Sequence, residues 1–289
     1  MHALIPALLA LLLPAAAQAH GDEVHGASWT FDPWVVLPLL LSLGAYAAGT
    51  ARLWRRAGPG RGIRPWQLGT YLAGWALMAG TLLSPLHWLG ERVFTLHMIE
   101  HEVVMALAAP LLVLARPAGA LAWALPAAWR RPALRWRPCG LQALLTAPVF
   151  ATIAHGIAIW AWHVPALFDA AVQHVTLHRL QHLSFILSAL LFWWALLRRC
   201  TAGAAAMHLF VTMLHTGLLG TLMALAPRVL YGAQTAGSAR LGLSALEDQQ
   251  LAGLVMWIPA GTVYAGAALA FLAVWIQRSG RAAGVADAR

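Results

Sequence analysis

Seven apolar windows, each close to twenty residues long, constrain this chain more than any other feature of its sequence. A helix of about twenty residues, rising about 1.5 Å per residue, crosses the hydrocarbon core of a membrane. Only 10% of the residues are charged and 61% are hydrophobic, whereas a soluble domain has about a quarter charged residues. We therefore predict an all-α fold, a polytopic membrane helix bundle with seven transmembrane helices in a domain at residues 34–276. The windows are 34–52, 66–86, 93–115, 143–162, 181–198, 206–226 and 251–276.

The start of the chain has the pattern of a cleaved signal peptide at residues 1–19. An apolar run at residues 3–13 is followed by AQA at residues 17–19, which matches the small-residue cleavage pattern A-x-A. The alternative is an uncleaved first helix, since neither Arg nor Lys precedes the run. Cleavage leaves a periplasmic tail at residues 20–33. This tail begins with His20, whose amine and imidazole together would chelate copper strongly.

The arginines predict the orientation of the helices. All 19 basic residues are Arg; fifteen fall in segments on one side of the predicted membrane and four on the other. The positive-inside rule then places the N-terminus outside and a cytoplasmic tail at residues 277–289. The membrane that we expect is a bacterial inner membrane. This orientation accounts for the net charge of +9 without a nucleic-acid partner, and membrane lipid is an expected partner. The fifteen are Arg52, Arg55, Arg56, Arg61, Arg64, Arg116, Arg130, Arg131, Arg135, Arg137, Arg198, Arg199, Arg278, Arg281 and Arg289.

Thirteen histidines among so few polar residues are the main chemical anomaly of the sequence. Most of them fall in the outer half of the predicted membrane region. His97 and His101 share one helix face four residues apart, and His178 and His182 do the same. Neutral imidazole is the commonest metal ligand in proteins, and it suits copper, zinc, iron and nickel. The pattern therefore predicts a metal site without naming the metal.

A wider set of candidate ligands follows from the same reasoning. Ionisable groups inside a membrane usually face the bundle interior or water, and several of these groups lie at one predicted depth. A lone histidine is more simply a structural residue, which is our interpretation of His87, in an outer loop, and of His208. Cys139 and Cys200 form no C-x-x-C pair, so no thiolate site is expected. The candidates are His97, His101, His163, His178, His182, His155, His215, Asp248 and His20.

The sequence HMIEH at residues 97–101 admits a different interpretation. It matches H-x-x-E-H, in which two histidines bind zinc in inverted metalloproteases and the glutamate acts as general base. The pattern fixes only three residues, and it leaves His163, His178 and His182 unexplained. An intramembrane zinc metalloprotease is therefore an alternative to the main hypothesis.

Four stretches of the chain resemble a known family. They are HMIEHEVVMALAAPLLVLARP, WHVPALFDAAV, HRLQHLSFILSALLFWWALL and EDQQLAGLVMWIPAG. Together they are similar to the CtaG-type cytochrome c oxidase assembly factors found with caa3-type oxidases, and the likeness covers roughly residues 34–276. W-H-x-P followed by H-x-x-x-H and an F-W-W run is a more specific combination than any single motif here.

This resemblance implies a function and partners. It implies a multi-helix membrane protein that helps to assemble the haem–copper oxidase, supplying copper as Cu(I) to the catalytic subunit rather than acting as an enzyme. A periplasmic copper donor would be a further partner. The chain departs from the family at Glu100, where a neutral residue is common, and at Gln181, where the family has an acid. The matching site residues are His97, His101, His163, His178, His182 and Asp248.

Two further alternatives remain at this point. A b-type haem protein would use His101 with His163 or His182 as axial ligands, and it would show a Soret absorption band. A transporter needs polar groups along its whole path, but below the outer half the predicted helices offer only His208 and a few hydroxyl groups. The sequence therefore favours metal handling at the outer side.

Overall fold

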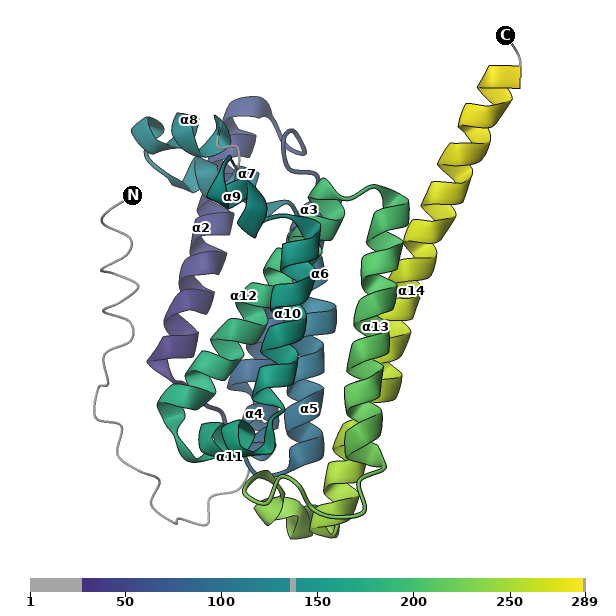
Figure 1. Cartoon of the computed structure of the whole chain (residues 1–289). Helices are drawn as coiled ribbons and strands as arrows, with labels where there is room; N and C mark the ends of the chain where they lie inside the picture. The colour runs from purple at the N-terminus through teal and green to yellow at the C-terminus, as the bar shows by residue number, and fades with distance from the viewer. Residues whose placement is uncertain (1–27, 136–138, 288–289) are drawn as a thin grey trace.

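The computed structural model describes residues 28–135 and 139–287, which form helices and no β-strands. Figure 1 shows these helices gathered into a bundle, with the last helix extending beyond it. The prediction of an all-helical fold is confirmed. The predicted signal peptide, His20 and most of the predicted tail lie outside the described residues, so their cleavage and metal capture stay predictions.

Long helical segments follow each of the predicted windows, and shorter helices join them. The long ones are α2 (Pro33–Ala57), α3 (Pro65–Leu83), α5 (Phe94–Glu102) continued by the π-helix η1 (Val103–Ala108) and α6 (Ala109–Leu114), α10 (Pro148–Trp162), α12 (Val175–Arg199), α13 (Ala202–Ala224) and α14 (Ala245–Asp287). The short ones are α4 (Pro85–Gly90), α7 (Pro117–Ala124), α8 (Ala127–Arg135), α9 (Leu141–Leu145), α11 (Pro165–Gln173) and the 3-10 helix η2 (Gln234–Leu241).

Proline marks many of the helix starts. Helices α2, α3, α4, α7, α10 and α11 each begin with Pro, whose fixed φ suits the first turn and whose missing N–H would have no intrahelical partner there. The first of them also has a side-chain cap, because the carboxylate of Asp32 accepts a hydrogen bond of 3.0 Å from the backbone N–H of Trp34. By contrast, α5 begins after Val93, which offers no capping side chain.

Several of these helices are suited to crossing a membrane. Five segments of the described chain are long and apolar enough to do so, namely α2, α5 through α6, α12, α13 and α14. Helices α10 and α11 add a sixth only if they count as one span, because the chain bends by 75° between them. Helix α3 follows the predicted window 66–86 but is not one of the five. The chain thus fits a multi-pass membrane protein, and the count of seven spans stays a prediction.

Two predicted windows differ in extent from the helices found at the same positions. The window 143–162 is divided, because α9 ends at Leu145 and α10 begins at Pro148. A residue that precedes proline is restricted toward extended conformations, and Ala147 is indeed extended. The window 251–276 is shorter than α14, which continues on both sides of it.

The segments predicted to share one side of the membrane lie at one end of the bundle. Arg52 donates a hydrogen bond of 2.6 Å to the carbonyl of Ala124, and Arg199 donates one of 3.0 Å to the carbonyl of Ala143. Figure 1 shows α7, α8 and α9 at this end and α4 and α11 at the other. The grouping agrees with the predicted topology, while the direction in which each end faces stays a prediction.

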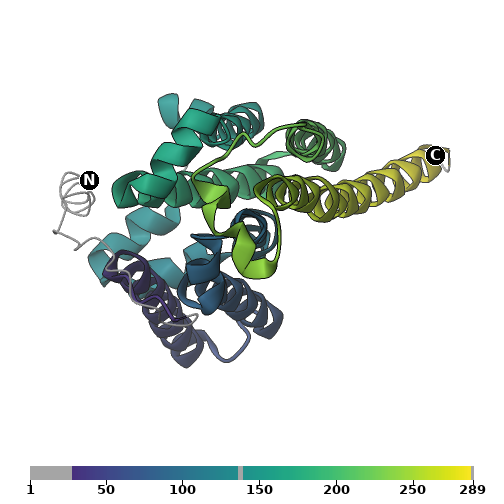
Figure 2. The same ribbon diagram turned by 90° about the horizontal axis from the view of Figure 1, so that it is seen from below.

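Helices α13 and α14 lie side by side along much of their length (Figures 1 and 2). Glycines allow this close approach: a Cβ atom at Gly220 would lie 2.7 Å from the carbonyl oxygen of Gly253, and one at Gly253 would lie 2.5 Å from the backbone nitrogen of Ala224. Small residues let helix backbones come close in membranes. This pair fixes the start of α14 relative to the rest of the bundle.

Candidate metal centre

Helix α5 carries the first two candidate ligands on one face. His97 and His101 are one turn apart, and their ring centroids lie 4.2 Å from each other. Residues four apart on a helix are neighbours on its surface, so the sequence spacing alone brings these rings together. The two histidines are 1% and 2% exposed, respectively, and are therefore removed from bulk water.

Helix α12 carries a second pair with the same spacing. The Nε2 atoms of His178 and His182 lie 2.9 Å apart, so one ring must donate its N–H to the other. The rings of α12 face those of α5: the centroid of His182 lies 5.0 Å from that of His101, and the centroid of His178 lies 5.7 Å from that of His97. Four of the predicted ligands therefore meet between two helices.

The donor atoms in this cluster are close enough for a metal ion. Those of His97, His178 and His182 all lie within 4.8 Å of one another. A second group, consisting of His87, Glu100 and His182, meets the same condition. Since metal–ligand bonds to nitrogen and oxygen are about 2.0–2.2 Å for an ion such as zinc, either group could close around one ion.

Unpaired ring nitrogens give an independent indication of a ligand. Both nitrogens of His97 and both nitrogens of His101 are buried without a hydrogen-bond partner, and so is Oε2 of Glu100. Leaving a buried polar atom unsatisfied costs about 1–3 kcal/mol, and native structures rarely contain several together. Coordination of a cation would satisfy one nitrogen of each ring and the oxygen of Glu100, so the residues present fit a bound metal.

His87 is a member of the cluster that the sequence did not reveal. The sequence favours an isolated structural residue at this position, but α4 places its Nδ1 2.7 Å from Oε1 of Glu100. The contact depends on the sharp turn from α4 into α5, which no spacing rule anticipates. The available signal was the position of His87 in a short segment directly before the H-x-x-E-H helix.

The join between α4 and α5 is tight. A Cβ atom at Gly90 would lie 2.9 Å from Oε2 of Glu100 and 3.4 Å from Cα of His97. Burial lowers the pKa of His87, but the hydrogen bond to Glu100 and the negative charges of Glu100 and Glu91 raise it more, so its pKa lies above the ordinary value. The end of the candidate centre at α4 therefore combines a basic imidazole with carboxylates.

His163 lies beside this cluster rather than within either donor group. It ends α10 and is 4% exposed. Its Nδ1 lies 2.7 Å from the carbonyl oxygen of Ile159, while its Nε2 has no partner. The rings of Phe168 and Phe185 each contact both His163 and a histidine of α5. His163 thus lies beside the histidine cluster, where its ring contacts the phenyl rings of Phe168 and Phe185.

His155 and His215 lie elsewhere in the bundle. His155 is fully buried, with Nδ1 3.1 Å from the hydroxyl of Ser188. His215 accepts a hydrogen bond of 3.3 Å from the indole N–H of Trp160. Neither belongs to a group of donor atoms that could hold a metal among the described residues.

Asp248 is also placed apart from the histidines, with its carboxylate engaged at the start of α5. Its Oδ2 accepts hydrogen bonds from the backbone N–H of Phe94 (2.9 Å) and the hydroxyl of Ser238 (2.7 Å). Its Oδ1 accepts from the backbone N–H of Thr95 at 2.8 Å. A negative charge at a helix N-terminus satisfies free N–H groups and complements the helix dipole. Asp248 thus supplies the cap that α5 lacks in its own sequence.

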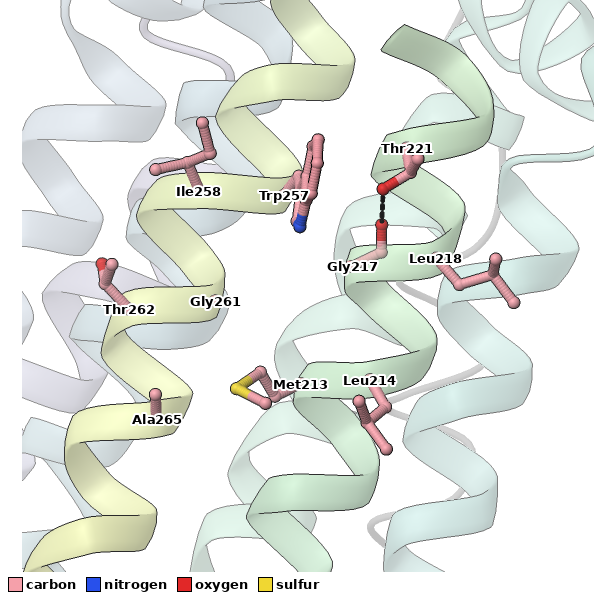
Figure 3. Close-up of a pocket in the computed structure, with 10 residues that line it drawn as sticks. All are labelled: Met213, Leu214, Gly217, Leu218, Thr221, Trp257, Ile258, Gly261, Thr262 and Ala265. Carbon is pink, nitrogen blue, oxygen red and sulfur yellow. Dashed lines mark hydrogen bonds between the residues drawn. The ribbon is translucent and has the colours of Figure 1, made fainter. Parts of the chain in front are cut away.

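A pocket of about 560 Å³ between α13 and α14 contains none of the candidate ligands. Figure 3 shows its lining, which includes Met213, Leu218, Trp257 and Ile258. The polar side chains drawn are those of Thr221 and Thr262 and the indole of Trp257. The pocket therefore offers little chemistry for a metal, unlike the histidine cluster.

The sequence of this chain matches a protein-family model and the sequences of known relatives. The model of the cytochrome c oxidase caa3 assembly factor family, Caa3_CtaG, matches residues 44–278. An uncharacterized protein of Mycobacterium bovis is 28% identical over 249 residues, which cover 79% of this chain and 36% of that protein. An uncharacterized protein of Mycobacterium leprae is 27% identical over 275 residues, covering 88% of this chain and 40% of that protein. The chain thus spans well under half the length of these relatives, and no solved structure matches it.

Proposed function

The chain belongs to the cytochrome c oxidase caa3 assembly factor family, and we propose that it serves oxidase assembly by binding copper at the histidine cluster and supplying it to the catalytic subunit. The role in assembly comes from the family. We further propose that the metal is copper and that the catalytic subunit receives it. An assembly role of this kind requires no catalysed reaction.

The observation that supports metal binding most directly is the set of unpaired imidazole nitrogens. His97 and His101 bring four buried ring nitrogens without partners, directly opposite His178 and His182. A site rich in imidazole suits copper, and also zinc, iron and nickel. The oxidase that the family assembles gives the reason to choose copper, which is then the cargo of the protein.

Delivery also requires a route by which the cargo enters and leaves. His178 is half-buried, and the side chain of His182 is 12% exposed, so the α12 side of the cluster is not sealed. The centre lies near the end of the bundle opposite to the arginine-rich segments, where α4 and α11 lie (Figure 1). With the predicted topology, a periplasmic copper donor would load the protein from this end.

The zinc protease and haem alternatives have less support. In H-x-x-E-H proteases the glutamate acts on a metal-bound water, whereas here Oε1 of Glu100 lies 2.7 Å from a ring nitrogen of His87. Haem ligation by His101 with His163 or His182 has no specific observation in its favour. Copper handling remains the proposal that uses the most members of the cluster.

Metal content tests this proposal. The full chain, purified in detergent, is loaded anaerobically with Cu(I), desalted and analysed for copper beside the His97→Ala/His101→Ala double variant. Copper should stay with the unaltered protein and be lost from the double variant. His174→Ala is the matched control, because His174 is an exposed residue at the start of the same α12 helix and should leave retention unchanged.

A cellular measurement tests the delivery step. Oxidase isolated from cells that make only the double variant should contain less copper, although the variant is present in the membrane in normal amount. Full copper content in that oxidase would contradict a supply role. Failure of the unaltered protein to retain Cu(I) would contradict copper binding itself.

A further inference from the structure

The end of the bundle opposite to the histidine cluster contains a pocket lined by cationic side chains. It has a volume of about 370 Å³ and lies where the end of α2 meets α7 and α8. Figure 1 shows α7 and α8 beside this end of α2. The lining residues are Arg52, Arg55 and Arg56 of α2, Trp123 of α7 and Arg130 of α8.

The helices that form this pocket carry no negative side chain to balance its four arginines. The sequence has no Asp or Glu between Asp32 and Glu91, and none between Glu102 and Asp169. Asp32 precedes the far end of α2 and pairs there with Arg179 at 2.9 Å. Among the described residues, none of the four arginines takes part in an ion pair. Because like charges repel one another, a bound anion would stabilise this arrangement.

Contacts with α7 already hold two of the guanidinium groups in place. One nitrogen of Arg52 donates hydrogen bonds of 2.6 Å to the carbonyl of Ala124 and 3.4 Å to that of Trp123. The guanidinium carbon of Arg130 lies 4.1 Å from the centre of the Trp123 ring, and its Nε is buried without a hydrogen-bond partner among the described residues. A guanidinium group has five N–H donors in a planar fork that matches a phosphate group. Both arginines therefore keep donors for such a ligand.

The surface of α2 that leads to the pocket is apolar. Leu37 lies on the same face as Arg55, since 18 residues at about 100° each complete five turns. Leu37 and Leu41 are 54% and 70% exposed, respectively. At the end of the bundle that holds the pocket, Trp66 and Trp129 are 52% and 62% exposed, as is typical of the boundary between membrane and water. The pocket thus combines a site for a negative group with a surface for hydrocarbon chains.

We propose that this pocket binds the phosphate group of an anionic phospholipid, whose acyl chains lie along the exposed leucines of α2. The positive-inside rule accounts for the number of arginines at this end, but not for their convergence from two helices on one pocket. Basic pockets on the cytoplasmic side of membrane helices suit such headgroups, and the predicted topology places this end in the cytoplasm. The site does not depend on the copper-handling function proposed above.

Stabilisation by lipid is the first test. The full chain, purified in detergent, is mixed with phosphatidylglycerol, with phosphatidylcholine or with inorganic phosphate, and its unfolding temperature is measured. A ligand that binds only the folded protein raises this temperature. Phosphatidylglycerol should raise it, whereas the zwitterionic phosphatidylcholine and inorganic phosphate should not. An equal rise with inorganic phosphate would mean a site for a free anion, and an equal rise with phosphatidylcholine would mean that the headgroup charge is not recognised; either result would overturn the proposal.

Two double variants that lose the same charge locate the binding site. Arg55→Gln/Arg130→Gln removes one pocket arginine from each of two helices. Arg61→Gln/Arg131→Gln is the matched control, because both residues are exposed at the same end and neither lines the pocket. The pocket variant should bind phosphatidylglycerol about tenfold more weakly than the control. Equal affinities would mean a general attraction between a basic surface and the lipid, and would overturn the proposal.

A pair of single variants keeps the test decisive if the pocket double variant does not fold. Arg55→Gln then takes its place, since Arg55 is an exposed residue of the pocket, and Arg61→Gln is its control. The affinity of Arg55→Gln for phosphatidylglycerol should be about fivefold lower than that of Arg61→Gln. Equal affinities of these two variants would overturn the proposal in the same way.

Discussion

Asp248 holds Thr95 through both of its donors: Oδ1 accepts a hydrogen bond of 2.8 Å from the backbone N–H of Thr95 and one of 2.6 Å from its hydroxyl. The two residues are 153 positions apart in the sequence. Because Thr95 lies in the first turn of α5, which carries His97 and His101, the first turn of α14 helps to determine where these candidate ligands lie. Asp248 is thus a positioning residue for the candidate metal centre.

Replacing Asp248 with Asn is expected to destabilise the protein and weaken metal retention. The amide loses the negative charge and brings an NH₂ group toward backbone N–H donors, so at least one buried hydrogen bond is lost. The expected cost is about 1–3 kcal/mol. Thermal unfolding of the detergent-purified protein, together with copper content after loading, would measure both effects.

The neighbouring carboxylate provides the control for that change. Glu247 lies on the same turn of α14, but it is exposed and bonds only the local residue Ser244. Glu247→Gln should leave copper retention unaltered. If Asp248→Asn retained copper as well as Glu247→Gln does, the hydrogen bonds from α5 to Asp248 would have no influence on copper binding.

Replacing Gly90 with Ala is expected to disturb the end of the candidate centre where α4 meets α5. The added Cβ would lie 2.9 Å from Oε2 of Glu100, closer than real Cβ atoms come, so the carboxylate of Glu100 must move away from it. Because that carboxylate is the end of a flexible side chain, the change displaces a candidate ligand at little cost in stability. Gly80→Ala is the matched control, because a Cβ there meets nothing within 4 Å. Lower copper retention after Cu(I) loading in the first variant alone is the expected result, and equal retention would contradict it.

Replacing Trp193 with Phe is expected to destabilise the π-helix. The indole N–H of Trp193 donates a hydrogen bond of 3.0 Å to the carbonyl of Met105 within η1, and phenylalanine leaves that buried carbonyl without its donor. The loss should be about 1–3 kcal/mol, seen as a lower unfolding temperature. Trp194→Phe, at a partly buried position beside the same core, should have the smaller effect, and equal losses would argue against the hydrogen bond.

The parts of the centre that could be predicted are those governed by local geometry. His97 and His101 meet because they are four residues apart on one helix, and the same holds for His178 and His182. That the two pairs face each other could only be guessed from their similar depth in the predicted membrane. The apolar windows likewise located the helices well, since helix formation across twenty apolar residues is a local property.

The parts that were missed depend on contacts between distant segments. The sequence predicts Asp248 as a metal ligand, but its carboxylate accepts hydrogen bonds from the backbone of Phe94 and Thr95, which no sequence pattern connects to it. His87 was set aside as a loop residue, although the tight turn at Gly90 brings it to Glu100. Both sets of contacts depend on where the first turn of α5 lies in the folded protein.

The π-helix η1 rotates the faces of α6 about the helix axis relative to the faces of α5. Before it, α5 turns its histidines toward α12; after it, α6 packs closely on α3, where a Cβ at Gly74 would lie 3.0 Å from the backbone nitrogen of Leu112. Each residue advances an α-helix by about 100°, so the wider turn changes the phase between the two halves. A single uninterrupted α-helix of this sequence would turn one of those faces away from its partner. The number of residues in η1, 103–108, is therefore as important to the candidate metal centre as the ligands themselves. Removing one of these residues would rotate chemically intact side chains away from their partners.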